Sequence, residues 1–174
     1  MNNIEKIKNS IRAIPDFPKK GILFRDITTA IKEPEILKLI IDEMYEAFKD
    51  DKIDYIVGLE SRGFIFGVPL AYRFGCGFVP IRKPGKLPAE VISTEYELEY
   101  GTDKIEIHKD ALKKTDRVLI VDDLLATGGT AGAAFRLVSQ LAQPIGACFL
   151  IELSALNGIE KLPKDSKIVS LIKY

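Results

Sequence analysis

Two adjacent aspartates followed by a glycine-containing loop are the residues of this sequence best suited to chemistry. Asp122 and Asp123 come directly after Val118–Val121, an aliphatic run typical of a strand buried on both faces of a parallel sheet. Ligands of open α/β sheets bind at the carboxyl ends of such strands. The loop that follows leads into a helix and consists of Ala126, Thr127, Gly128, Gly129 and Thr130. Its backbone N–H groups, two hydroxyls and helix dipole favour a phosphate, so the nearby acids should hold sugar hydroxyls or a metal-bound face instead.

Two simpler interpretations of this segment explain it less well. Aspartates often cap helices, but capping requires one acid and does not require the Thr-Gly-Gly-Thr sequence that follows. A Walker A loop is excluded because no lysine follows the glycines. The span Gly58–Gly63 has a similar glycine spacing, yet Phe64 stands where that motif needs lysine. The segment is therefore interpreted as a phosphate site of another kind.

Basic residues follow two further strands of the predicted sheet. Arg62 lies in a loop after the strand expected over residues 55–59, and that loop taken alone is equally consistent with an ordinary capping turn. Arg82, Lys83 and Lys86 follow the strand expected over residues 77–81. Three charges in a loop are usually only solvated, but these occur at the ligand-binding edge of the sheet. Each charge-assisted contact to an anion contributes roughly 1.5–3 kcal/mol.

The remaining sequence predicts the elements that position these residues. Helices are expected over residues 4–14, 35–49, 64–75 and 129–141, and strands over residues 22–26, 55–59, 77–81, 118–121, 147–152 and 168–172. Residues 84–106 alternate in polarity and predict a long mobile hairpin. Strands that alternate with helices indicate an α/β fold with a parallel, doubly wound sheet, and 174 residues fit one domain.

Composition excludes several other classes of protein. The 25 basic and 25 acidic residues cancel, so no overall field attracts nucleic acid. No apolar run approaches the roughly 20 residues of a membrane helix, and the N-terminal segment lacks the apolar core of a signal peptide. Cys76 and Cys148 lie in apolar surroundings typical of a reducing compartment, and we expect a cytoplasmic protein. With these cysteines and the lone His108, a zinc site is not expected; His108 is interpreted as structural.

Five motifs together resemble one known family. The segment VLIVDDLLATGGT (118–130) is similar to the signature with which type I phosphoribosyltransferases bind phosphoribosyl pyrophosphate (PRPP). The resemblance extends to the adenine phosphoribosyltransferases through FRDI (24–27), GLESRGFIFG (58–67), IRKPGKLP (81–88) and YELEYG (96–101). These motifs span residues 22–130, most of the expected catalytic core, in the order and approximate spacing of that group.

The resemblance implies a fold and a reaction. It implies a doubly wound sheet of the type I phosphoribosyltransferase kind in a single domain (1–174), with a small N-terminal hood (1–33) on the base side and a mobile β-hairpin flap (84–106). Adenine and PRPP would give AMP and pyrophosphate in purine salvage, through an oxocarbenium-like transition state. The Mg²⁺ cofactor would be carried by PRPP and not held by dedicated protein ligands. A homodimer is implied, with Arg25 and the segment near Arg82 close to its interface, and no nucleic acid or membrane partner.

The resemblance also assigns roles to individual residues. Asp122 and Asp123 would grip the ribose hydroxyls and take part in catalysis, and the loop Ala126–Thr130 would hold the 5′-phosphate. The pyrophosphate group would be bound by Glu60, Ser61, Arg62, Arg82, Lys83 and Lys86, with a cis peptide bond between Glu60 and Ser61. Phe24 would stack on the purine while the backbone around Arg25 reads its exocyclic amine. Glu99 would handle a proton of the base, as a general base or proton-shuttling carboxylate, and Tyr100 would help to close the flap.

Two alternatives stay open at this point. A xanthine or hypoxanthine-guanine phosphoribosyltransferase would share the PRPP loop but not the FRDI and YELEYG segments. Base choice is read by backbone atoms, which leave no residue signature, so adenine rests on the resemblance. A non-catalytic PRPP-sensing regulator would usually add a DNA-binding module or a basic face, and this sequence has neither the extra length nor a net positive charge.

Overall fold

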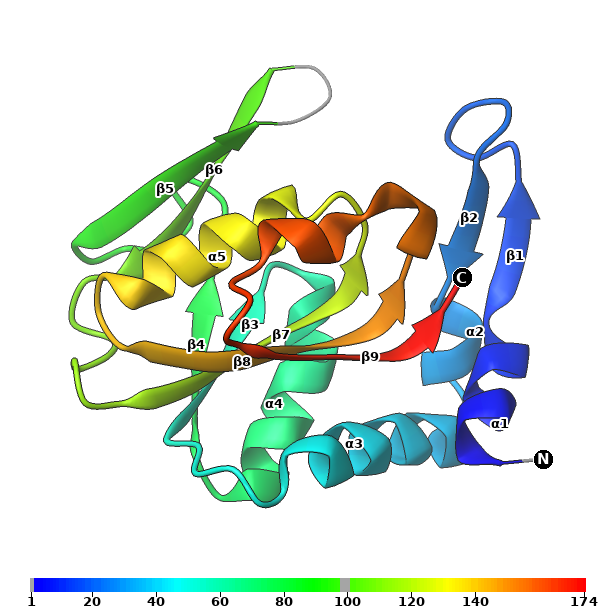
Figure 1. The fold of residues 1–174 in the computed structure, drawn as a ribbon, viewed down its shortest axis with the longest axis horizontal. Coiled ribbons are helices and arrows are strands. Elements are labelled where there is room, and N and C mark those ends of the chain that lie inside the picture. Colours follow the sequence, from blue (N-terminus) through cyan, green and yellow to red (C-terminus); the bar gives the residue numbers. More distant parts are fainter. Residues whose placement is uncertain (1, 98–100) are drawn as a thin grey trace.

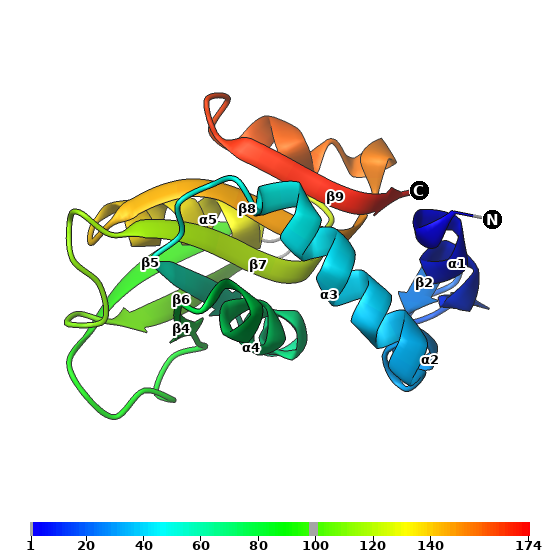
Figure 2. The same ribbon diagram turned by 90° about the horizontal axis from the view of Figure 1, so that it is seen from below.

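A five-stranded parallel sheet forms the centre of the molecule. The computed structural model describes residues 2–97 and 101–174. Strands occur in the order β4-β3-β7-β8-β9, and each pair of neighbours runs parallel. Their bounds are β3 (Tyr55–Leu59), β4 (Gly77–Ile81), β7 (Arg117–Leu125), β8 (Gln143–Glu152) and β9 (Lys167–Lys173). Helices cover both faces of the sheet (Figures 1 and 2), so the prediction of a doubly wound α/β fold is confirmed.

Each face of the sheet contributes to its own hydrophobic core. Helices α3 (Pro34–Phe48) and α4 (Arg62–Phe74) pack on one face, and α5 (Gly129–Ser139) packs on the other. Along β7, Val118 and Ile120 belong to the α5 core, whereas Leu119 and Val121 belong to the opposite core. Successive side chains of a strand point to opposite faces, and all four of these are fully buried. This explains why the strand reads as an uninterrupted aliphatic run.

The N-terminal segment forms a small unit beside the carboxyl end of the sheet. Helix α1 (Asn3–Ser10) is followed by β1 (Arg12–Pro15), which pairs antiparallel with β2 (Leu23–Asp26), and by α2 (Thr28–Ile31). A helix predicted to extend to Ile14 is therefore wrong in its last turn. The apolar spacing is helical up to that point, but β2 offers a hydrogen-bonding partner that the local pattern does not reveal.

A two-stranded hairpin projects from the opposite side of the molecule (Figure 1). Its arms are β5 (Val91–Glu97) and β6 (Thr102–His108). The predicted segment 84–106 therefore begins seven residues before the first arm and stops two residues before the end of the second. Arg82 is joined to Glu106 of β6 by two backbone hydrogen bonds of 2.9 and 2.8 Å. The imidazole Nε2 of His108 accepts a hydrogen bond from the Ala89 N–H at 3.4 Å, consistent with a structural role.

Strand β7 is longer than the sequence predicts. It continues through Asp122 and Asp123 to Leu125, because β8 extends to Glu152 and supplies backbone partners along that length. The aspartates therefore lie within the last hydrogen-bonded part of β7 and not in a loop after it. Two short 3₁₀ helices, η1 (Ser154–Leu156) and η2 (Gly158–Lys161), connect β8 to β9.

Two predictions from composition also have structural outcomes. Cys148 is buried, Cys76 is partly buried, and neither forms a disulfide. In the described ranges, 2–97 and 101–174, no helix combines the length and apolar character required to cross a membrane.

Candidate active site

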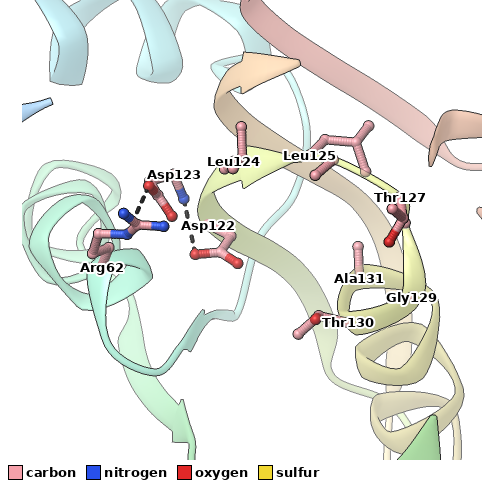
Figure 3. A pocket seen from close by; sticks show the side chains of 11 residues that line it. Arg62, Asp122, Asp123, Leu124, Leu125, Thr127, Gly129, Thr130 and Ala131 are labelled. Atoms are coloured by element: carbon pink, nitrogen blue, oxygen red, sulfur yellow. Dashed lines mark hydrogen bonds and ion pairs between the residues drawn. The ribbon is translucent and has the colours of Figure 1, made fainter. Parts of the chain in front are cut away.

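A cavity lies where β7 passes into α5, at the loop predicted to bind phosphate. Gly128 adopts a left-handed conformation with φ of 78°, which turns the chain so that α5 begins at Gly129. The cavity has a volume of about 200 Å³, and its lining consists of Arg62 and residues 122–131. Figure 3 shows Arg62 and the aspartates on one side, with Thr127 and Thr130 on the other. Free N–H groups and the helix dipole at this end of α5 favour an anion in the cavity.

A residue that the sequence analysis missed supports this loop from behind. A Cβ atom added to Gly158 would lie 2.1 Å from the Ala126 carbonyl oxygen, and one added to Gly128 would lie 2.2 Å from the Gly158 carbonyl oxygen. The two backbones therefore touch, which only glycine permits. Asn157-Gly158 is a recognisable turn dipeptide, but nothing in it indicates what the turn packs against.

The aspartate pair lies against the first turn of α4. The Arg62 guanidinium Nε is 2.9 Å from Asp123 Oδ2, and the Asp123 N–H donates to Asp122 Oδ1 at 2.9 Å. A Cβ atom on Gly63 would lie 2.6 Å from the Val121 carbonyl oxygen and 3.1 Å from Asp122 Oδ1. The absence of a side chain at Gly63 thus lets α4 approach the aspartates closely, and it brings together two motifs that are 60 residues apart.

Both carboxyl groups have raised pKa values. Burial, and then the charge of Asp123, raises the pKa of Asp122 well above its usual range. Burial also raises the pKa of Asp123, which is only 4 % exposed, although the Arg62 guanidinium opposes this shift. Two neighbouring carboxylates cannot both ionise freely in such surroundings. The pair is therefore suited to hydroxyl groups or to a cationic partner that would restore its charge.

Glu60 organises two of the predicted pyrophosphate-binding cations. Its carboxylate accepts hydrogen bonds from the Arg82 guanidinium at 3.3 and 3.4 Å, from the Lys86 ammonium at 2.5 Å and from the Lys83 N–H at 2.8 Å. Burial opposes ionisation, but the bonds from Lys86, Lys83 and Arg82 outweigh it and lower the pKa of Glu60 to about 2. Glu60 is therefore ionised, and it contacts the cations that were predicted, together with it, to bind pyrophosphate. The peptide bond from Glu60 to Ser61 is cis, as the resemblance implied.

Lys83 has two partners on the hairpin. Its ammonium contacts the Asp103 carboxylate and donates to the Tyr96 hydroxyl at 2.9 Å. Neither Tyr96 nor Asp103 was predicted to belong to the site. Tyr96 belongs to the YELEYG motif, but no role was assigned to it. Asp103 is brought to Lys83 only by the tertiary structure.

An apolar cavity adjoins the first. It has a volume of about 190 Å³ and is lined by Ile22, Leu23, Phe24, Arg25, Arg62, Asp123, Leu124, Ile151 and Leu153. Phe24 makes an edge-on contact with Phe17 at 5.1 Å between ring centroids. The Arg25 guanidinium lies over the Tyr174 ring, 3.7 Å from its centroid. Ile151 and Leu153, at the end of β8, were not predicted, because their apolar type marks them only as core.

Two predicted residues, Glu99 and Tyr100, lie outside the described residues. The other predicted positions fall into three neighbouring groups: the cavity at the start of α5, the cations around Glu60 and Lys83, and the apolar cavity beside β2. The first and third groups share Arg62 and Asp123.

The chain is similar to known proteins over nearly its whole length. The family model described as "Phosphoribosyl transferase domain" matches residues 28–173. An adenine phosphoribosyltransferase of Acaryochloris marina is 58% identical over 169 residues, which cover 97% of this chain and 99% of the relative. The crystal structure of the Thermoanaerobacter pseudethanolicus adenine phosphoribosyltransferase has a TM-score of 0.94 at 55% identity, with 98% of this chain and 99% of that chain covered.

A ligand-bound relative is also similar along the whole chain. The structure of the Saccharomyces cerevisiae adenine phosphoribosyltransferase was determined in complex with an imino-altritol bisphosphate and adenine. It has a TM-score of 0.92 at 45% identity and covers 98% of each chain.

Proposed function

The chain belongs to the phosphoribosyl transferase family, and we infer that it is a purine-salvage enzyme that converts adenine and PRPP into AMP and pyrophosphate. One observation carries this function furthest. The cavity at the start of α5 and the apolar cavity share Arg62, Asp123 and Leu124, so a sugar could join a phosphate in one to a flat base in the other. A xanthine or hypoxanthine-guanine enzyme and a PRPP-sensing regulator have no comparable support, since three relatives that are 56–58% identical over 97% of this chain are named adenine phosphoribosyltransferases.

The 5′-phosphate is assigned to the loop Ala126–Thr130. The loop amides and the dipole of α5 bind the phosphate without contributing a net positive charge, so the 5′-phosphate serves as an anchor for PRPP. Anchoring a group remote from the reacting carbon allows its binding energy to orient the anomeric carbon for attack.

The ribose hydroxyls are assigned to Asp122 and Asp123. Carboxylates accept hydrogen bonds from hydroxyls, and their negative charge favours the positive charge that develops on the ring as pyrophosphate leaves. In the reaction, the bond from the anomeric carbon to the pyrophosphate oxygen breaks and a bond to N9 of adenine forms. The electron pair of the broken bond departs with pyrophosphate.

The leaving group is assigned to the cations Arg62, Arg82, Lys83 and Lys86, and Glu60 is assigned the task of holding two of them. The Ser61 position is assigned a backbone contact to the same group. Hydrogen bonds from ionised donors to phosphate oxygens stabilise the charge that pyrophosphate gains.

Mg²⁺ fits this site as a companion of PRPP. Among the described residues, no group of three or more His, Cys, Asp or Glu side chains could hold a metal ion by itself. Asp122 and Asp123 offer carboxylate oxygens in the lining of the cavity at the start of α5, and Mg²⁺ is commonly bound by one or two carboxylates together with substrate phosphates. When bound, the ion would neutralise charge on the departing pyrophosphate.

The base is assigned to the apolar cavity, where Phe24 stacks on the ring and the backbone around Arg25 reads the exocyclic amine. A site built to hydrogen-bond one substituent rejects its analogue by as much as roughly 10⁴–10⁵-fold. Glu99 is proposed to accept the N9 proton, and Tyr100 to help the hairpin exclude water that would hydrolyse PRPP. We also propose a homodimer with Arg25 and the segment near Arg82 close to its interface, and a cytoplasmic location.

The test is pyrophosphate release from PRPP and Mg²⁺ with adenine, hypoxanthine, guanine and xanthine offered separately. We expect release with adenine alone, together with AMP. Release with an oxopurine instead would preserve the PRPP site and overturn the choice of base. PRPP binding without release in all four reactions would identify a regulator.

A further inference from the structure

Lys83 is held by the hairpin through a closed set of polar contacts. Its ammonium contacts the Asp103 carboxylate and donates to Tyr96 Oη at 2.9 Å, and the Tyr96 hydroxyl donates to Asp103 Oδ2 at 2.9 Å. The second oxygen of Asp103 accepts from the Lys104 N–H at 2.7 Å. An ammonium has three N–H donors, and contacts with the described residues use two of them. One donor is therefore left to point toward a ligand.

Tyr96 is fixed by packing as well as by these bonds. It is buried in the core shared by α5 and the sheet, and a Cβ atom on Gly129 would lie 3.5 Å from its ring. Gly129 is the first residue of α5, at the predicted 5′-phosphate site. The ring of Tyr96 thus connects the phosphate loop to the Lys83 ammonium, which is assigned to the other end of PRPP.

Asp103 is fixed relative to the same segment. It lies directly opposite Tyr96 in the hairpin, and β6 is joined to Arg82 by the two backbone hydrogen bonds of Glu106. The N–H of Gly85 also donates to the Glu106 carboxylate at 3.2 Å. Because these bonds bracket Lys83, the distance from Lys83 to the hairpin is set on both sides.

We propose that Tyr96 and Asp103 are positioning residues that orient the Lys83 ammonium toward the pyrophosphate group of PRPP. This proposal rests on the proposed function, because it takes Lys83 to be a pyrophosphate ligand. A lysine side chain has a flexible four-carbon stem and loses much conformational freedom when its ammonium binds an ion. Two fixed partners remove that freedom before PRPP arrives, so less of the binding energy is lost to ordering.

The competing explanation is an ion pair that only stabilises the hairpin. A second lysine–carboxylate pair, at the base of the same hairpin, provides the comparison, because Lys109 lies 2.8 Å from Glu90 and both side chains are more than half exposed. Exposed pairs contribute little to stability. The Lys83 pair differs in its buried tyrosine partner and in its position beside Arg82 and Glu60.

The experiment compares D103N, Y96F and K83M with the control E90Q. The readouts are KM for PRPP, KM for adenine, and the Kd of Mg²⁺-pyrophosphate from calorimetry. We expect D103N and Y96F each to raise the PRPP KM and the pyrophosphate Kd by roughly 3- to 30-fold, which lies within the range of coupling between residues in contact. The adenine KM should stay at its original value, and E90Q should change neither quantity.

A double-mutant cycle separates positioning from general damage. In the K83M background, D103N should have no further effect on pyrophosphate binding, because the group on which Asp103 acts is absent. An equal effect of D103N with and without Lys83, an unchanged Kd in D103N, or tighter pyrophosphate binding would each overturn the proposal. Y96F removes one oxygen only, so it tests the same idea if D103N fails to fold. Absence of turnover by the unmodified protein would refute the proposed function separately, since pyrophosphate binding is measured directly.

Discussion

Replacement of Glu60 by glutamine should destabilise the protein in a manner that depends on pH. The bonds from Lys86, Lys83 and Arg82 outweigh burial and lower the Glu60 pKa from 4.5 to about 2. If the unfolded chain has the ordinary value, that difference corresponds to about 3 kcal/mol of folding free energy at neutral pH. The Arg82 and Lys86 side chains are 34% and 49% exposed, so solvent screening reduces the expected contribution to roughly 1–2 kcal/mol.

The sign of the pH dependence follows from the lowered pKa. A carboxyl with a folded pKa below its unfolded pKa contributes its full stability above the unfolded value, near pH 4.5, and loses it as the pH falls toward the folded value, near 2. Asp122 and Asp123 have raised pKa values and act in the opposite direction. The informative quantity is therefore the difference in unfolding free energy between the unmodified protein and E60Q, in which the contributions of other groups cancel.

Urea unfolding followed by circular dichroism at several pH values measures this difference. We expect it to be constant at roughly 1–2 kcal/mol from neutral pH down to about pH 5, and to decrease steadily below that. E90Q is the matched control, because it removes a carboxylate from an exposed lysine pair and should leave the curve unchanged. Equal stability of E60Q and the unmodified protein at neutral pH, or a difference that persists unchanged near pH 2, would refute the reasoning.

Three further predictions concern the site. D122N combined with D123N should lower turnover by at least about 100-fold, as losses of transition-state charge stabilisation do. Urea unfolding should show a fold at least as stable as before. Burial raises both pKa values because it disfavours the charged carboxylates, and neutral amides remove this cost of burying charge. G158A should raise the PRPP KM strongly, because its Cβ would lie 2.1 Å from a carbonyl oxygen of the phosphate loop. G132A is the control and should change the PRPP KM little, because its Cβ would lie 3.2 Å from the nearest carbonyl oxygen. Equal KM values for the two variants would contradict this. F24A should raise the adenine KM by roughly 5- to 160-fold, the range that corresponds to measured stacking energies, and leave the PRPP KM unchanged in initial-rate measurements.

The parts of the fold that were predictable are those with a local physical cause. Val118–Val121 reads as a buried strand because both faces of the sheet are covered, and the structure buries every one of these side chains. The loop after it is recognisable because phosphate binding needs small residues and free amides at a helix start. Such features are written into consecutive residues, so one sequence suffices to find them.

The parts that were missed depend on contacts between distant segments. Gly158 supports Gly128 from 30 residues away, and Asp103 reaches Lys83 only because the hairpin folds back on the segment after β4. Asp103 lies between Thr102 and Lys104, and nothing in this local sequence marks Lys83 as its partner. The end of β7 at Leu125 was missed for the same reason, since its length is set by the neighbouring strand β8.

The distribution of charge explains how four cations can be held together before PRPP binds. Arg62 pairs with Asp123, Arg82 and Lys86 pair with Glu60, and Lys83 pairs with Asp103. Without these carboxylates the cations would repel one another and extend into solvent, and PRPP would have to gather them at the expense of its own binding energy.

These ion pairs leave some N–H donors of the cations for binding pyrophosphate. An arginine has five N–H donors and a lysine three, and the bonds to the carboxylates use only part of that number. Pyrophosphate oxygens can therefore be bound by the remaining donors while Glu60 and Asp103 stay in place. On this argument the acids at the pyrophosphate side act as fixed supports for the cations, and their removal should weaken pyrophosphate binding even though it makes the site more positive.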